Sequence, residues 1–266
     1  MPKFLLRRII VENQEMGGIG FTCGHWPLDP EKPTLIFIHG AASNNAFWNH
    51  QVTYFSEIVN AVAVDLPGHG ASPGPGREKV SEYADAVLNF IDLIRAPRPI
   101  PCGLSMGGAI TQQLLVSHHQ RFTAGILINT GARLKVLPSI FDTIEKNYGD
   151  FVNMLFSFAI SPKNSSGKLR TEIEASTICR PAVASGDFRA CNGFNVSDAL
   201  GSIEIPVLVM AASDDNLTPV KYGAFLANSI NHAELITIQD AGHFSPLEKP
   251  LEVNQAINDF LIRTLP

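Results

Sequence analysis

The sequence of 266 residues lacks several features that define large classes of protein. No apolar run approaches the roughly 18 residues that a membrane-spanning helix needs, because the longest candidate, Phe151–Ile160, is interrupted by Asn153 and Ser157. Lys and Arg number 20 against 25 Asp and Glu, so no basic excess favours binding to nucleic acid. The four cysteines form no CxxC motif and are too few for a disulfide scaffold.

Signals for export, metal binding and cofactor binding are also missing. The segment Met1–Arg8 contains neither the uninterrupted apolar stretch nor the small-residue cleavage site of a secretory signal, so we expect a cytoplasmic protein. No His, Cys or carboxylate cluster has metal-ligand spacing, and no GxGxxG motif stands at a strand-to-helix turn. We therefore expect no metal and no cofactor. We also expect a monomer or homodimer that binds neither membranes nor nucleic acid.

The chain has ample apolar material, and its order predicts an α/β fold. Hydrophobic residues make up 45% of the sequence and the net charge is only −5, which favours a large folded core. Short apolar runs typical of buried strands alternate with longer segments of helical periodicity, so we predict a mostly parallel sheet covered by helices. Residues 4–11 and 19–23 are expected to form an antiparallel edge hairpin. The other expected strands are Thr34–Ile38, Ala61–Val64, Ile100–Cys102, Ala124–Ile128, Pro206–Ala211 and Glu234–Ile238, and the expected helices are Val80–Ile94, Gly107–His118 and Leu251–Leu261.

Residues 133–200 interrupt the alternation of strand and helix. They contain no segment typical of a buried strand, whereas Ile140–Tyr148 and Asp150–Ala159 have helical spacing. We predict a helical insertion here, lying over a core made of residues 1–132 and 201–266. The apolar stretch near residue 155 is expected to fill the interior of the insertion. If it lines a substrate pocket instead, the candidate residues are Met154, Phe156 and Phe158.

The strongest local signal for chemistry is Gly103–Gly108, in which glycines stand two positions before and two after Ser105. The segment follows an expected strand and precedes an expected helix. A serine on such a sharp turn has a strained backbone that exposes its hydroxyl, and side chains at the two glycine positions would collide across the turn. A glycine-rich turn can also merely connect two elements, so the motif needs partners elsewhere in the chain.

Those partners stand after two later strands. A serine hydroxyl becomes a good nucleophile only with a base within reach, and a carboxylate commonly holds a histidine base in the right tautomer. His243 follows the strand expected at 234–238, while Asp214 and Asp215 follow the one expected at 206–211. Because parallel strands end at the same edge of a sheet, all of these residues are expected at the edge that carries Ser105.

The segment His39–Ser43 supplies the remaining requirement, a site for negative charge. Its small residues follow the strand expected at 34–38 and allow the backbone to approach a ligand closely. We expect the amides of Ala41 and Met106 to hold the developing oxyanion. Losing one such donor typically costs about 2.7–4 kcal/mol of transition-state stabilisation.

Five short sequence landmarks, spread over most of the chain, resemble the α/β-hydrolase family in type and in order. The resemblance implies an eight-stranded sheet with a helical cap after the sixth strand, Ser105 as nucleophile and His243 as base. In similar sequences the acid is followed by two residues, then a small or hydroxyl residue, then proline, which favours Asp215 over Asp214. The resemblance also implies that the amides of Ala41 and Met106 are the oxyanion donors. The landmarks are His39-Gly40, Asp65–Ser72, Gly103–Gly107, Asp215–Pro219 and Gly242-His243.

The hypothesis that follows is a serine hydrolase of carboxylesterase type, acting on a small, fairly apolar ester through an acyl-enzyme. Serine at the turn argues against haloalkane dehalogenases and epoxide hydrolases, which the chain otherwise resembles but which use aspartate there. Enol-lactonase, carbon–carbon bond hydrolase and thioesterase activities stay open, as does a hydrolase-like receptor that binds its ligand and turns it over slowly. An anionic substrate should require an arginine of the insertion facing the pocket, and Arg133, Arg180 and Arg189 are the candidates.

Overall fold

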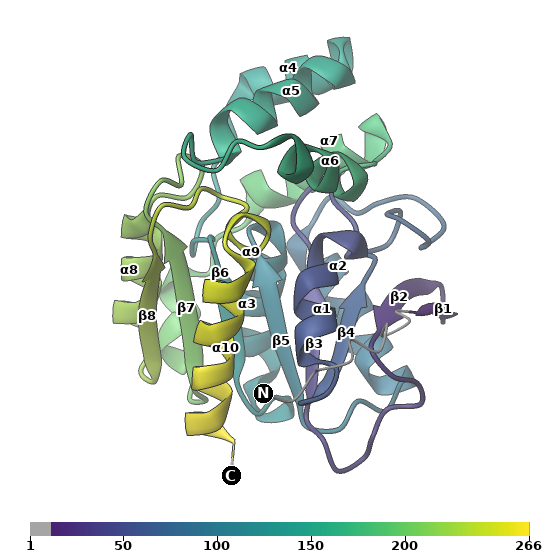
Figure 1. Cartoon of the computed structure of the whole chain (residues 1–266), viewed down its shortest axis with the longest axis vertical. Coiled ribbons are helices and arrows are strands. Elements are labelled where there is room, and N and C mark those ends of the chain that lie inside the picture. The colour runs from purple at the N-terminus through teal and green to yellow at the C-terminus, as the bar shows by residue number, and fades with distance from the viewer. Residues whose placement is uncertain (1–11, 266) are drawn as a thin grey trace, which may run out of the picture.

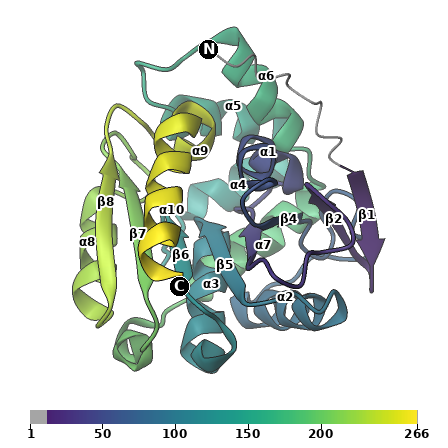
Figure 2. The ribbon, with the colours of Figure 1, turned by 60° about the horizontal axis from the view of Figure 1, so that its bottom comes forward.

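A computed structural model describes residues 12–265 and, within them, an eight-stranded sheet in the order β1-β2-β4-β3-β5-β6-β7-β8. The six strands from β3 to β8 are parallel, and β1 and β2 pair antiparallel at one edge, so that β1 and β8 lie at opposite edges (Figures 1 and 2). This architecture confirms the predicted fold class. The strands are β1 (Glu12–Met16), β2 (Ile19–Cys23), β3 (Thr34–Ile38), β4 (Asn60–Val64), β5 (Pro99–Leu104), β6 (Gly125–Ile128), β7 (Val207–Ala212) and β8 (Ala233–Ile238).

Helices cover both faces of the sheet in the described part of the chain. In Figure 1, α10 lies in front of the sheet and α8 behind it. None of the helices described is long and apolar enough to cross a membrane. The helices are α1 (Asn49–Phe55), α2 (Val80–Leu93), α3 (Met106–His118), α4 (Pro138–Lys146), α5 (Tyr148–Ala159), α6 (Gly167–Ser176), α7 (Pro181–Gly193), α8 (Val220–Ser229), α9 (Ser245–Glu248) and α10 (Pro250–Thr264), with 3-10 turns at Asn45–Trp48, His119–Arg121 and Ser197–Ser202.

The central strand β3 shows why short apolar runs form this sheet. All five of its residues are buried, and successive side chains point to opposite faces. Leu35 and Phe37 belong to the apolar cluster that includes α1 and α10, whereas Ile36 and Ile38 belong to the cluster that includes α2 and α3. A strand buried on both faces needs no polar positions, so it appears in the sequence as a continuous apolar run.

Within the described residues, an antiparallel hairpin lies at one edge of the sheet. Its strands are β1 and β2, which pair around Gly17 and Gly18, and both of these glycines have positive φ angles of 61° and 80°. The second predicted strand, residues 19–23, is therefore confirmed. The first predicted strand, residues 4–11, lies outside the described residues. The turn requires a left-handed backbone, which glycine adopts without a steric penalty.

Four α-helices of the described chain, α4 to α7, follow β6 and precede β7, in the stretch where the sequence predicted a helical insertion. Residues 133–200, which contain these helices, are called the insertion below. Its helices lie beyond the carboxyl ends of the parallel strands (Figure 1). The helical spacing recognised in the sequence covers most of α4 and α5 but does not include α6 and α7. Gly167 and Pro181 are the first residues of α6 and α7. Proline is well suited to the first position of a helix, because a backbone N–H at that position would have no acceptor within the helix.

The sheet order places a crevice where the site is expected. From β3, the chain continues to β4 on one side and later to β5 on the other side. Loops that leave β3 and β5 at their carboxyl ends therefore diverge and leave a crevice between them. In open α/β sheets, ligands usually bind at such a point, where the strand order reverses. The segments containing Ala41 and Ser105 are these two loops.

Candidate active site

Ser105 occupies a strained turn between β5 and α3. Its φ and ψ angles are 54° and −114°, which are unusual for a residue with a side chain. The turn is also tight: a Cβ atom at Gly103 would lie 2.0 Å from the carbonyl oxygen of Gly107, and one at Gly107 would lie 2.1 Å from that of Ile38. Both glycines are thus required by backbone contacts. The Ser105 amide donates to the Ile128 carbonyl and the Thr130 hydroxyl donates to the Ser105 carbonyl, which fixes the turn to the end of β6.

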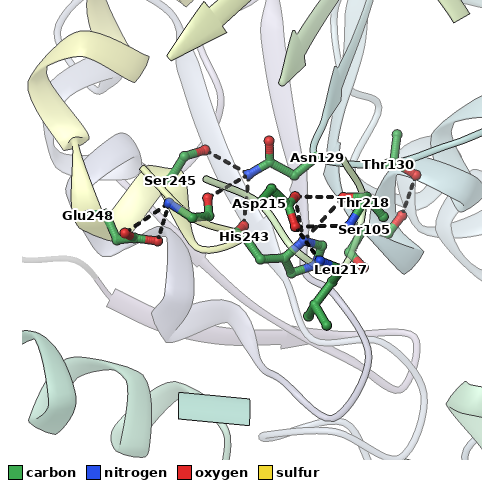
Figure 3. Close-up of polar contacts among 10 residues, drawn as sticks. Ser105, Asn129, Thr130, Asp215, Leu217, Thr218, His243, Ser245 and Glu248 are labelled. Atoms are coloured by element: carbon green, nitrogen blue, oxygen red, sulfur yellow. Dashed lines mark hydrogen bonds and ion pairs between the residues drawn. The ribbon is translucent and has the colours of Figure 1, made fainter. Parts of the chain in front are cut away.

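His243 and Asp215 lie in direct contact after β8 and β7. The Nδ1 atom of His243 lies 2.9 Å from Oδ2 of Asp215, and both residues are buried at 4% exposure (Figure 3). A carboxylate oxygen accepts hydrogen bonds, so Nδ1 of His243 carries the proton and donates it. That arrangement leaves Nε2 of the neutral ring as an acceptor. The ring also lines the same cavity as Ser105.

Asp215 is held as an anion by its own loop. The Leu217 and Thr218 amides donate to Oδ1 at 2.8 and 2.9 Å, and the Thr218 hydroxyl donates to Oδ2 at 2.7 Å. Burial by itself would raise the pKa of this carboxyl. The attraction to His243 when its ring is protonated, together with the hydrogen bonds from His243 and Thr218, outweighs burial and lowers the pKa below its ordinary value. In the sequence, Thr218 served only as part of the pattern that favours Asp215 over Asp214. In the structure its hydroxyl contacts the carboxylate.

The neighbouring carboxylate of Asp214 points elsewhere. It accepts hydrogen bonds from the hydroxyls of Ser161 and Ser213 at 2.7 and 2.8 Å. These two bonds lower the pKa of Asp214. Ser161 belongs to the insertion, so Asp214 joins the insertion to the loop after β7, whereas Asp215 contacts the histidine.

The loop carrying His243 is held by residues that the sequence did not single out. The Asn129 side-chain amide, at the end of β6, donates to the His243 carbonyl at 2.8 Å and to the Ser245 hydroxyl at 2.9 Å (Figure 3). On the other side, the Glu248 carboxylate accepts from the Gly242 amide at 3.0 Å. These partners are common residue types without a motif, and only the folded chain reveals their role.

The loop after β3 presents the Ala41 amide next to a fixed histidine. His39 is wholly buried, and its Nε2 accepts from the Leu66 amide at 3.1 Å, so Nδ1 carries the proton and donates to the Gly40 carbonyl at 2.8 Å. Burial, reinforced by the charge of His69, lowers the pKa of His39 well below its ordinary value. Among residues 12–265, the Ala41 and Met106 amides donate to no described protein atom, so both are available to a ligand.

A cavity with an empty volume of about 470 Å³, part of it open to solvent, is lined by Ala41, Ser105 and His243. The lining includes Leu155 of the insertion, whereas the predicted candidates from the same helix are not among the described lining residues. Met154 packs inside the insertion, the Phe156 ring lies under Arg170, and Phe158 is exposed. Helical neighbours differ by about 100° in direction, so Met154 and Phe156 cannot share the face that Leu155 presents. The lining residues are Gly40, Ala41, Ser43, Phe47, Leu104, Ser105, Leu155, Thr177, Phe188, Leu217, His243 and Phe244.

No described residue of this lining is an arginine or a lysine. The three arginines considered for an anionic substrate are exposed elsewhere. Arg180 donates to the Gly74 carbonyl, Arg189 pairs with Glu78 at 2.7 Å, and Arg133 lines a separate surface hollow. The lining is therefore mostly apolar, and Ser43 and Thr177 are its described polar residues besides Ser105 and His243.

One cluster of side chains offers metal-ligand chemistry. The ligand atoms of His69, Cys179 and Asp187 all lie within 4.8 Å of one another. Their spacing in the sequence gave no sign of a site, because they come from three separate segments. Nε2 of His69 donates to Oδ2 of Asp187 at 2.8 Å, and Nδ1 lies 3.2 Å from the Pro67 carbonyl oxygen. Hydrogen bonds within the protein thus already use both ring nitrogens.

These contacts make His69 a cation. Both of its ring nitrogens face oxygen acceptors, which only a doubly protonated ring can satisfy. Burial opposes this charge, but the carboxylate of Asp187 outweighs burial and raises the pKa of His69 to about 10. The side chains of both residues are fully buried, so the two charges depend on each other.

A sequence profile of the alpha/beta hydrolase family matches residues 35–256, which run from β3 into α10 and contain all of the loops just described. The chain belongs to the alpha/beta hydrolase family. This match confirms the family that the motifs predicted, and with it the expectation of an enzyme.

Named relatives of this alpha/beta hydrolase act on esters and lactones. The chain is 29% identical to 3-oxoadipate enol-lactonase 2 of Acinetobacter baylyi over 249 residues, which cover 88% of this chain and 90% of that one. The crystal structure of the enol-lactonase from Burkholderia xenovorans has a TM-score of 0.84 at 20% identity, covering 94% of this chain and 100% of that chain. The structure of a thermophilic esterase has a TM-score of 0.78 at 29% identity, covering 96% and 98%. The same scaffold therefore carries both activities.

Proposed function

We propose that this protein is a carboxylesterase-type serine hydrolase that cleaves small, uncharged esters. The observation that carries the proposal is the 2.9 Å contact between His243 and Asp215, at a cavity that the hydroxyl-bearing residue Ser105 also lines. Nucleophile, base and acid occupy loops that leave β5, β8 and β7 at one edge of the sheet. The roles follow from the chemistry of these groups, with the Ala41 and Met106 amides as oxyanion donors.

The reaction proceeds in two similar halves. Nε2 of His243 accepts the Ser105 proton while Oγ attacks the ester carbonyl carbon, and the Asp215 carboxylate stabilises the imidazolium that forms. The amides of Ala41 and Met106 bind the oxyanion. His243 then gives its proton to the departing alcohol, which leaves an acyl group on Ser105. A water molecule, deprotonated by His243, attacks this ester and releases the acid.

The charge and shape of the cavity support the choice of substrate. Its walls are mostly apolar, and no described arginine or lysine is available in its lining to pair with a carboxylate. Burying an unpaired anion there would be costly. Residues 133–200 act as the cap in this proposal, because Leu155, Thr177 and Phe188 close the cavity from the insertion side.

The similarity to 3-oxoadipate enol-lactonase 2 supports a second candidate, the opening of a lactone by the same groups. An uncharged lactone and a lactone bearing a carboxylate distinguish the two ideas. The ester proposal predicts turnover of p-nitrophenyl butyrate and of the neutral lactone, with kcat/KM for the carboxylate-bearing lactone lower by at least about tenfold. Preference for the charged lactone would favour the second candidate.

The direct test is the Ser105→Ala variant with p-nitrophenyl butyrate as substrate. We expect kcat to fall by about 10⁶-fold, in the range seen when a triad nucleophile is removed, with an unchanged circular dichroism spectrum. The matched control is Ser117→Ala, an exposed serine on α3 whose hydroxyl contacts only Gln113 among the described residues. Full activity in Ser105→Ala would contradict the proposal. Turnover in the wild type slower than ligand release would instead indicate a receptor.

A further inference from the structure

The loop after β3 is bonded to the insertion at three consecutive residues. The Ala42 amide donates to Oδ2 of Asp187 at 2.8 Å, and the Ser43 hydroxyl donates to the Ser176 carbonyl at 2.8 Å. The side-chain amide of Asn44 donates to the Ala175 carbonyl at 3.3 Å. The first of these bonds differs from the others because its acceptor is a wholly buried carboxylate.

That carboxylate is itself held rigidly. Besides the Ala42 amide, Oδ2 of Asp187 accepts from His69, and Oδ1 accepts from the Tyr83 hydroxyl at 2.5 Å. Tyr83 is fixed in turn, since its oxygen accepts from the Arg77 amide at 2.8 Å. Three donors from separate parts of the core therefore set the position of one side chain from α7.

The bond to Asp187 acts on the backbone beside the Ala41 amide. The Ala41 N–H belongs to the peptide group between Gly40 and Ala41, whose carbonyl accepts from His39. The next peptide group, between Ala41 and Ala42, carries the N–H that Asp187 holds. Ala42 has a φ angle of 57°, a conformation that persists in a residue with a side chain only when its surroundings hold it. His39 and Asp187 thus fix the peptide groups on the two sides of Ala41.

We infer that Asp187 is a positioning residue, which orients the Ala41 amide toward the carbonyl oxygen of the substrate by holding the Ala42 amide. This inference rests on the proposed function. The oxyanion site is then shared between the core, which provides its donors, and α7 of the insertion, which sets the direction of one of them. An unfavourable direction weakens this donor most when charge develops on the oxygen, so the effect belongs to the transition state.

The test is the Asp187→Asn variant of the full chain, assayed with p-nitrophenyl butyrate and with butylboronic acid, which forms a tetrahedral anion on an active serine. We expect kcat to fall about 10- to 100-fold, KM to change less than about threefold, and the inhibition constant of butylboronic acid to rise in parallel with the loss of kcat. Asp150→Asn, an exposed acid on α5, is the matched control and should match the wild type.

A purely structural role predicts a lower melting temperature with unchanged kcat and unchanged boronic acid binding, and that result would overturn the inference. If Asp187→Asn does not fold, Tyr83→Phe decides, because it removes one donor to the carboxylate and keeps the charge pair. We expect about a three- to tenfold loss of kcat there with a parallel loss of boronic acid binding, and no change in either overturns the inference. Inactive wild-type protein would contradict the proposed function itself. Active wild type with a fully active variant contradicts only the role of Asp187.

Discussion

Two buried aspartate–histidine pairs are present among the described residues, and they differ in which nitrogen of the ring contacts the carboxylate. In the pair of Asp215 and His243, the carboxylate binds Nδ1 of the ring, and the ring lines the cavity. In the pair of Asp187 and His69, the carboxylate binds Nε2, and Nδ1 faces the Pro67 carbonyl. The first ring keeps a nitrogen for proton transfer. The second uses both nitrogens as donors and is a fixed cation.

The comparison shows that a carboxylate beside a histidine does not by itself define a catalytic pair. What the second ring nitrogen faces decides whether the ring can accept a proton from a substrate or a nucleophile. The proposed division of labour is that Asp215 supports the base, whereas Asp187 supports the oxyanion loop and joins the insertion to the core. The predictions below test this division of labour and the surroundings of the two pairs by different observables.

The largest difference is expected when each histidine is replaced by glutamine. His243→Gln should lower kcat/KM for p-nitrophenyl butyrate by about 10⁴- to 10⁶-fold, because the base is lost. His69→Gln should lower it less than about thirtyfold, yet it should destabilise the fold by about 3–5 kcal/mol, because Asp187 is left buried without a counterion. Steady-state kinetics and urea unfolding of both variants measure the contrast. Similar activity losses in the two variants would refute the assignment.

A second contrast concerns the adjacent acids after β7. Asp215→Asn should reduce kcat about 10⁴-fold, because an amide cannot stabilise the imidazolium and favours the wrong tautomer. Asp214→Asn is the matched control, since the Asp214 carboxylate contacts Ser161 and Ser213 rather than His243, and its kcat should stay within about threefold of the wild type. The reverse order of effects would exchange the two roles.

The pairs should also differ in how they link stability to pH. The pKa of His69 is raised to about 10, against an ordinary value of 6.5, so the folded chain keeps a proton that the unfolded chain loses. Its contribution is complete below about pH 6.5 and is lost as pH rises toward 10, by at most about 1.4 kcal/mol per pH unit. The pKa of Asp215 is lowered, so its contribution is present above the ordinary carboxyl pKa and is lost as pH falls through its folded value.

Urea unfolding between pH 6 and pH 9 measures the alkaline part of this dependence. The wild type should lose stability more steeply than His69→Gln, in which the titrating ring is absent. The comparison between proteins removes the contributions of groups that do not interact with His69. Asp65 and His39 interact with its charge, so any change in their contributions belongs to the measured difference. Parallel curves for the two proteins would show that His69 does not hold its proton in the fold.

The smallest expected effect concerns the wall of the cavity. Leu155→Ala should enlarge the space beside Ser105 and raise the preference for hexanoate over butyrate esters by about three- to tenfold, because a methylene group in an apolar pocket changes binding modestly. Met154→Ala, on the same helix but outside the described lining, should leave the ratio of the two kcat/KM values unchanged. An equal shift in both variants would mean that α5 acts through its overall packing.

The sequence predicted the parts of the molecule whose structure is determined locally. The bounds of β3 matched the expected Thr34–Ile38, and the glycines around Ser105 stand where backbone contacts exclude a Cβ. In the insertion, local periodicity indicated the helices near α4 and α5 but not α6 and α7. Asp187 could not be predicted, since its partners Ala42, His69 and Tyr83 lie 145, 118 and 104 positions away. No short window of sequence contains such a cluster.

The most direct test of the account is covalent labelling with a fluorophosphonate, followed by mass spectrometry of the digested protein. The account predicts one adduct per chain, located on Ser105, in both the wild type and His69→Gln. It predicts almost no adduct in His243→Gln over the same time, because the hydroxyl then has no base. An adduct on another residue, or labelling of His243→Gln at the wild-type rate, would contradict the claim that Ser105 is the nucleophile and His243 its base.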